Sequence, residues 1–220
     1  MSPLSGPPRT PAKAWAVMAR GNERFIAGAP EHPRQDVERR EELANMQAPH
    51  AALFGCSDSR LAAEIIFDKG IGDLFVVRNA GQIISESVIG SLEYAVGVLE
   101  VPLIVVLGHD ECGAVRAAID SREPDAPVLP PHIAHLIQKI EPAVARVTAK
   151  RNEAGTEDPI DSQEVGREHL RDTIAELIEA SELISDAIAA GTLGIVGANY
   201  KLLEGRAVPD IMLGDLELAP

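Results

Sequence analysis

Short apolar runs alternate along the chain with longer segments in which apolar residues recur at helical spacing. The clearest run covers residues 103–107, five consecutive apolar residues with β-branched members. Residues 51–55 and 193–198 form similar runs, and residues 73–78 form a shorter strand candidate. Runs of this kind are typical of strands that are buried on both faces, as in a parallel sheet. The pattern therefore predicts an α/β fold with a mostly parallel central sheet flanked by helices.

The remaining periodic segments predict helices and one hairpin. In the segment that contains Leu92 and Tyr94, both side chains are expected to face inward. Residues 200–208 suggest a hairpin that turns at Glu204 and Gly205. The predicted helices cover residues 10–27, 36–46, 87–99, 112–120, 132–148 and 162–190.

Two cysteines and a histidine follow two of the predicted strands. Cys56 comes directly after the first apolar run, and His109 and Cys112 follow the run that is clearest. Because ligands in α/β folds collect at the carboxyl ends of strands, we expect these side chains to lie close together. Two thiolates and an imidazole supply three ligands for a tetrahedral zinc. The fourth position is then left to water or to an acid such as Asp58, as a catalytic zinc requires.

Composition and charge narrow the class of protein. The 220 residues carry a net charge of −14, which argues against a nucleic-acid or anionic-membrane partner because phosphates need clustered Lys and Arg. No apolar run is long enough to predict a membrane span. Two cysteines without a recognisable export signal predict a reducing, cytoplasmic location and metal or redox chemistry. We expect residues 1–9 to be a disordered lead-in and residues 10–220 to form a single domain.

Other polar side chains have competing interpretations. Asp58 and Arg60 closely follow Cys56, and they are either a solvated turn or a functional pair beside a metal. His132 and His135 offer a second pair at ligand spacing, for which exposed residues at a helix start are the favoured interpretation. The chain has no phosphate-binding G-x-x-x-x-G-K-[ST], no G-x-G-x-x-G after a strand and no G-x-S-x-G nucleophile elbow.

The segments around the two cysteines carry a family resemblance. Residues 56–60 read Cys-Ser-Asp-Ser-Arg, and residues 108–115 read Gly-His-Asp-Glu-Cys-Gly-Ala-Val. These two segments, at this separation, resemble the two signatures of the β-class carbonic anhydrases. Supporting matches extend the resemblance over about residues 21–208 and fall at residues 21–25, 72–81, 90–96 and 195–200.

The resemblance implies a metal centre and an activity. By it, one Zn²⁺ per chain is bound by Cys56, His109 and Cys112, while Asp58 and Arg60 form a dyad beside the metal. The implied activity is the reversible hydration of carbon dioxide to bicarbonate and a proton. A zinc-bound hydroxide would attack the substrate while Asp58 accepts the hydroxide's hydrogen.

The resemblance also implies a substrate pocket and an assembly. Gln47 would reach into the neighbouring subunit's site, so the catalytic unit would be a homodimer, with a tetramer left open. The implied fold adds an antiparallel edge to the parallel sheet and a helical arm at residues 10–27 that embraces the partner. The pocket residues implied by the resemblance are Gln47, Phe75, Ala80, Tyr94 and Gly113.

One position departs from the family pattern. Some members bind a second, non-catalytic bicarbonate through a tryptophan, an arginine and a tyrosine. Leu53 stands here at the tryptophan position, although Arg78 and Tyr200 fit the other two. Bicarbonate inhibition of this type is therefore not expected, and the variant whose zinc keeps a water is favoured.

Two other functions fit the same residues. The first keeps the zinc and hydrolyses carbon disulfide or carbonyl sulfide, as relatives of this fold do. The second is a non-catalytic zinc-buffering or thiol-redox module that uses Cys56 and Cys112. The intact pair of Asp58 and Arg60 speaks against the second function, because a sensor needs neither residue.

Overall fold

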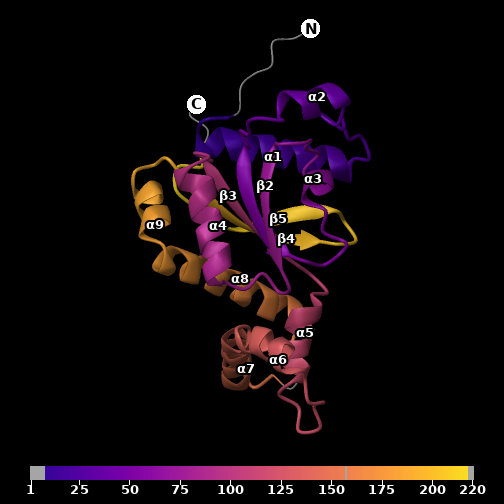
Figure 1. Cartoon of the computed structure of the whole chain (residues 1–220). Coiled ribbons are helices and arrows are strands. Elements are labelled where there is room, and N and C mark those ends of the chain that lie inside the picture. Colours follow the sequence, from indigo (N-terminus) through magenta and orange to yellow (C-terminus); the bar gives the residue numbers. More distant parts are fainter. Residues whose placement is uncertain (1–7, 157, 218–220) are drawn as a thin grey trace.

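The central feature of the computed structural model, which describes residues 8–156 and 158–217, is a five-stranded sheet in the order β2-β1-β3-β4-β5 (Figure 1). β1 to β4 run parallel, and β5 pairs antiparallel with β4 across a hairpin. This arrangement confirms the predicted α/β class, the antiparallel edge and the hairpin. The strands are β1 (Ala51–Cys56), β2 (Leu74–Asn79), β3 (Leu103–His109), β4 (Gly194–Lys201) and β5 (Arg206–Leu213).

Helices cover both faces of the sheet. On one face, Leu53 and Val105 pack in a cluster with Met18 of α1, and on the other face Ile104 packs in a cluster with Leu92 of α4 and with α8. Every residue of β1 and β3 is buried, which explains why these two strands read as continuous apolar runs. The helices are α1 (Pro11–Ile26), α2 (Val37–Glu42), α3 (Ala63–Ile66), α4 (Glu86–Gly97), α5 (Gly113–Asp120), α6 (Pro131–Gln138), α7 (Glu141–Ala154), α8 (Ser162–Ala180) and α9 (Glu182–Ala189).

The amino-terminal helix packs on its own subunit. Thr10 caps α1, because its side chain accepts a hydrogen bond from the backbone N–H of Lys13. Ala14 and Met18 are fully buried against the sheet of the same chain. The buried face of the predicted arm therefore packs within its own chain, while the embrace of a partner subunit stays a prediction. Most of the predicted lead-in, residues 1–7, lies outside the described residues.

Three predicted helices are shorter or divided. The helix expected over residues 36–46 is only the six residues of α2, none of which is buried. The helix expected over residues 132–148 is α6 followed by α7, because Pro142 in the first turn of α7 has no backbone N–H with which to continue α6. The helix expected over residues 162–190 divides at Ser181, whose hydroxyl accepts from the Ile184 N–H and caps α9. The short helix α3 has no counterpart among the predictions.

Tyr94 faces the opposite way from the prediction. It is 44% exposed, whereas Val88, Leu92 and Ala95 of the same helix are buried. These three residues are spaced four and three apart and form one face of α4, which Tyr94 does not share. No helix in the described ranges is long and apolar enough to cross a membrane.

The core predicts a measurable difference between two leucines. Leu92 has no exposed surface and Leu203 is 99% exposed. Leu92→Ala is expected to lower the free energy of unfolding by about 2–5 kcal/mol, through lost burial and the cavity left behind. The matched control Leu203→Ala is expected to change it by less than about 0.5 kcal/mol. Urea unfolding of both variants measures the difference, and equal values would contradict the described core.

Candidate metal centre at the carboxyl ends of β1 and β3

Three metal-type ligands meet where two neighbouring strands end. Cys56 is the last residue of β1, His109 is the last residue of β3, and Cys112 precedes the first turn of α5. β1 and β3 are parallel neighbours, so their carboxyl ends lie side by side. The ligand atoms of the three residues all lie within 4.8 Å of one another, and all three residues are buried. The structure thus brings together the triad expected from the sequence.

A tight loop returns Cys112 toward Cys56. The backbone N–H of Asp110 donates to the Tyr200 carbonyl on β4 at 3.1 Å. The Asp110 carboxylate accepts from the Leu202 N–H at 2.9 Å, which fastens the loop to the end of β4. Glu111 then takes a left-handed conformation with φ of 50°, which reverses the chain before α5.

His109 has one nitrogen engaged and one free. Its Nδ1 lies 2.7 Å from the Asp110 carbonyl, which can only accept, so Nδ1 carries the hydrogen. Its Nε2 is buried and has no partner among the described residues. A buried nitrogen without a partner is costly unless something outside the chain binds it. A lone pair on Nε2 beside two sulfurs is the donor set that zinc prefers, so the residues fit the metal.

The surroundings of Cys56 favour the thiolate form of its side chain. Hydrogen bonding to Cys112 is the largest cause that lowers the pKa of the Cys56 thiol, and contacts with His109 and the Gly81 N–H lower it further. The Gly81 N–H lies 3.4 Å from Cys56 Sγ, and Gly81 has a left-handed φ of 79°. His169, only 3% exposed on α8, approaches the Gly81 carbonyl with Nε2 at 2.7 Å. The sequence carried no signal for this role of His169.

This chain of contacts predicts an effect of His169 on the metal. His169→Phe removes the donor that fixes the Gly81 peptide, so we expect affinity for Zn²⁺ to fall about 10- to 100-fold, the usual effect of losing an outer partner of a metal ligand. His135→Phe, at an exposed site on α6, is the control. Competition with a chromophoric chelator measures both affinities. Equal affinity in the two variants would show that His169 only fills space.

Asp58 and Arg60 form a closed pair at the rim of the triad. Asp58 Oδ1 accepts from the Arg60 backbone N–H and from Nε, both at 2.9 Å, and Oδ2 accepts from Nη2 at 2.7 Å. Arg60 Nη2 also donates to the Glu111 carbonyl at 3.1 Å, which ties the pair to the loop before Cys112. The Arg60 hydrogen bonds hold the pKa of the Asp58 carboxyl well below its usual range. The carboxylate is therefore ionised at neutral pH.

Arg78 links the pair to β1. Its Nε donates to the Cys56 carbonyl at 2.9 Å, and its Nη2 donates to the Asp58 carbonyl at 2.6 Å. Arg78 thereby fixes the turn that follows Cys56. This role differs from the bicarbonate-binding role that the family resemblance associates with its position.

The expected pocket residues fall into two groups. Ala80 and Gly113 adjoin Gly81 and Cys112 and so lie at the triad. Gln47, Phe75 and Tyr94 do not approach it within one chain. All three lie toward the amino ends of the strands. Gln47 precedes β1, Phe75 pairs with Ala52 near the start of β1, and the Tyr94 ring lies 6.1 Å from the Phe75 ring.

Distance along the sheet explains the separation. Cys56 pairs with Asn79, and Phe75 is four residues before Asn79 on β2. Four residues of a strand span about 13 Å, so the aromatic pair is too far from the sulfur of its own subunit to touch a small substrate there. His132 in the first turn of α6 and His135 in its last turn are both exposed, as the favoured interpretation predicted, although only His132 lies at the helix start.

Comparison with known proteins identifies the family. A family model described as carbonic anhydrase matches residues 51–207, which include all three ligands. The chain belongs to the β-carbonic anhydrase family. Carbonic anhydrase 2 of Mycobacterium tuberculosis is 46% identical over 96% of this chain and 98% of its own length. The carbonic anhydrase of Mycolicibacterium smegmatis is 43% identical over the same shares of the two chains.

Solved structures agree on the fold. A β-carbonic anhydrase of Sordaria macrospora, described as tetrameric, superposes with a TM-score of 0.69 at 24% identity, covering 92% of this chain and 94% of the other. At this identity the likeness concerns the fold alone. Family membership makes this chain a carbonic anhydrase, as its resemblance to the family predicted.

Proposed function

We propose that this carbonic anhydrase hydrates carbon dioxide reversibly to bicarbonate with one Zn²⁺ held by Cys56, His109 and Cys112. The observation that carries the proposal is the buried cluster of two sulfurs and one unpartnered imidazole nitrogen, with ligand atoms within 4.8 Å of one another. Three protein ligands are the number that a catalytic zinc keeps. When bound, zinc supplies a Lewis acid that makes water nucleophilic near neutral pH.

Asp58 orients the attacking water. Its carboxylate is ionised, and both of its oxygens accept hydrogen bonds from Arg60. A carboxylate held in this way can accept a hydrogen bond from the attacking water with its remaining lone pairs, which directs an oxygen lone pair at the carbon of carbon dioxide. Arg60 positions Asp58 and does not touch the substrate.

His109 and Cys56 keep their electron pairs available to the metal. The Asp110 carbonyl fixes the hydrogen of His109 on Nδ1, which leaves Nε2 as the ligand atom. The Gly81 N–H supports negative charge on Cys56 Sγ. Free buried thiols serve as ligands only while they stay reduced, which supports the proposal of a cytoplasmic location.

A homodimer would complete the substrate pocket. Gln47, Phe75 and Tyr94 lie far from the triad of their own chain, while Tyr94 is 44% exposed on the surface of the chain. We propose that the three residues line the site of a second subunit, where the aromatic rings exclude water and Gln47 donates to an oxygen of the substrate. Ala80 and Gly113 would line the same site from its own subunit. Pairing of dimers into tetramers is a further proposal, and the Sordaria relative is described as tetrameric.

The dimer proposal predicts linked losses of assembly and activity. Tyr94→Glu places a charge in the proposed interface, so we expect monomers in sedimentation velocity and a hydration rate at least about tenfold lower. Ile133→Glu, at a site on α6 that is 45% exposed, is the matched control and is expected to change neither quantity. Monomers that keep full activity would contradict the shared pocket.

The two alternative functions are less well supported. Membership of the carbonic anhydrase family favours carbon dioxide over carbon disulfide or carbonyl sulfide as the substrate. The doubly hydrogen-bonded carboxylate of Asp58 favours catalysis over a zinc-buffering or thiol-redox module, because metal storage needs no acceptor beside the metal.

A further inference from the structure

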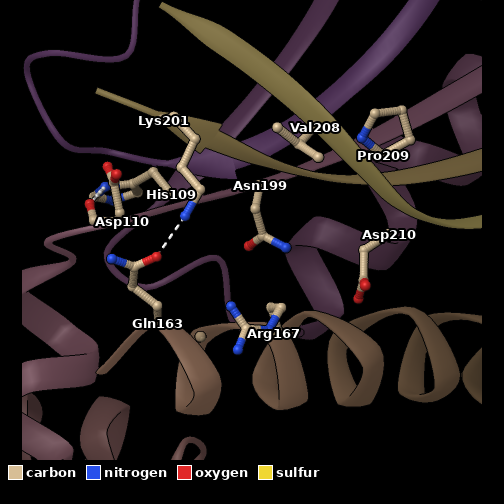
Figure 2. A pocket seen from close by; sticks show the side chains of 10 residues that line it. His109, Asp110, Gln163, Arg167, Asn199, Lys201, Val208, Pro209 and Asp210 are labelled. Atoms are coloured by element: carbon tan, nitrogen blue, oxygen red, sulfur yellow. Dashed lines mark hydrogen bonds between the residues drawn. The ribbon is translucent and has the colours of Figure 1, made fainter. Parts of the chain in front are cut away.

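A cavity of about 130 Å³ separates α8 from the β4–β5 hairpin and reaches His109 and Asp110 at one end (Figure 2). We propose that this cavity binds a small planar oxyanion of the carboxylate type. A cavity of this size holds several water molecules and therefore has room for an anion of about four or five heavy atoms. The proposal requires neither occupancy of the metal centre nor the mechanism given above.

Two cations on the cavity wall have no acidic partner among the described residues. Figure 2 shows Arg167 rising from α8 and Lys201 extending from β4 on the opposite side. Within residues 8–156 and 158–217, Arg167 makes no side-chain hydrogen bond and no ion pair. In the same part of the chain, the Lys201 side chain donates only to the neutral Gln163 carboxamide. A planar guanidinium matches the two oxygens of a carboxylate, and the ammonium adds a second charged donor.

The two carboxylates at the cavity are already engaged. Asp110 Oδ1 accepts from the Leu202 N–H at 2.9 Å, and Asp210 Oδ1 accepts from Arg171 at 3.2 Å. Asp210 also lies at the far end of the view from Lys201 (Figure 2). Only Asp210 is paired with a cation, whereas Asp110 keeps its charge at the His109 end of the cavity. Arg167 and Lys201 are therefore the charged donors that an anion can meet away from that end. Because the whole chain carries a net charge of −14, binding depends on these direct contacts and is expected to be weak.

Carboxamides supply the neutral donors. Asn199 points from β4 toward α8 (Figure 2), and its side chain makes no hydrogen bond to the described residues. The absence of a side chain at Gly108 creates the space for it, since a Cβ there would lie 3.0 Å from Asn199 Oδ1. Gln163 uses its oxygen for Lys201, which leaves its amide N–H groups free to donate. Donors from one helix and one strand thus converge on one cavity.

The proposed site is separate from the residues that some relatives use for a second bicarbonate. Side chains alternate along β4, so Asn199 and Lys201 face α8, whereas Tyr200 belongs to the cluster on the α1 face. Arg78 is occupied by the carbonyls of Cys56 and Asp58. The cavity is therefore on the other face of the sheet from Tyr200.

Binding of fluoroacetate to the zinc-loaded protein tests the site, with ¹⁹F line broadening as the readout. Arg167→Gln is expected to raise the dissociation constant about tenfold. Arg167→Lys, which keeps the charge, is expected to raise it less. Arg20→Gln, at an exposed position of α1, is the control and should not change it. Asn199→Leu removes a donor from a different element and fills the cavity, so it should also weaken binding.

Unchanged thermal midpoints and hydration rates establish that the variants are folded, because neither Arg167 nor Asn199 belongs to the catalytic machinery. Competition then identifies the natural ligand. If bicarbonate displaces fluoroacetate at matched ionic strength, the ligand is bicarbonate, the product of the family's reaction. If only acetate displaces it, the ligand is an organic carboxylate. No binding by the wild type, displacement by neither anion, or equal binding by wild type and Arg167→Gln would overturn the proposal.

Discussion

Cys56→Ser is expected to abolish metal binding and carbon dioxide hydration together. A serine hydroxyl at the end of β1 does not ionise near neutral pH, so one of two thiolates is lost from a site with three protein ligands. The variant also loses the sulfur to which Gly81 donates. Zinc content by elemental analysis should fall from about one per chain to near zero. Stopped-flow hydration should fall to the rate of the buffer.

The control for this substitution is the neighbouring position. Ser57 is exposed directly after Cys56, and among the described residues only its backbone forms a hydrogen bond, from its N–H to the Asn79 carbonyl. Ser57→Ala is expected to keep both zinc and activity. Full zinc content in Cys56→Ser would show that the metal is held elsewhere, and would remove the basis of the proposed site.

Asp58→Asn is expected to separate chemistry from metal binding. The substitution keeps the shape of the side chain but removes its charge and one acceptor oxygen from the pair with Arg60. Zinc content should remain at about one per chain, because the three ligands are untouched. The hydration rate should fall about 10²- to 10⁴-fold, as for loss of a positioned proton acceptor. Retained activity would show that Asp58 and Arg60 only form a solvated turn.

Asp125→Asn, in the exposed loop after α5, is the matched control and should leave the rate unchanged.

The pH dependence of stability adds a second readout for Asp58. Because Arg60 lowers the pKa of Asp58, this carboxylate favours the folded state at every pH above the ordinary carboxyl pKa of about 3.9. That contribution is lost only as the pH falls through the lowered value. The difference in free energy of unfolding between the wild type and Asp58→Asn should therefore stay nearly constant between neutral and mildly acidic pH.

The sheet and the metal triad were predictable because their signals are local. β1 and β3 are buried along their whole length, so their residues form uninterrupted apolar runs. Cys56 and His109 follow those runs directly, and parallel strands bring such ends to one edge. His109 and Cys112 are close in sequence, so the short loop through Glu111 is enough to bring their side chains together.

Other features depend on contacts between distant segments. His169 reaches Gly81 across 88 positions of the sequence, so nothing near either residue indicates the contact. Tyr94 was predicted to face inward with Leu92, but the helical period places it on the other face of α4. The family resemblance assigned Gln47 to the neighbouring subunit's site and named Phe75 and Tyr94 as pocket residues without assigning them to a subunit. The strand register places these two rings far from the triad of their own chain.

Stopped-flow hydration of carbon dioxide by the zinc-assayed protein at pH about 7 and about 9 is the most direct test of the account. The account predicts about one zinc per chain, turnover that is fast at the higher pH, and loss of that turnover when a chelator removes the metal. One bound zinc per chain with hydration no faster than buffer at either pH would contradict it.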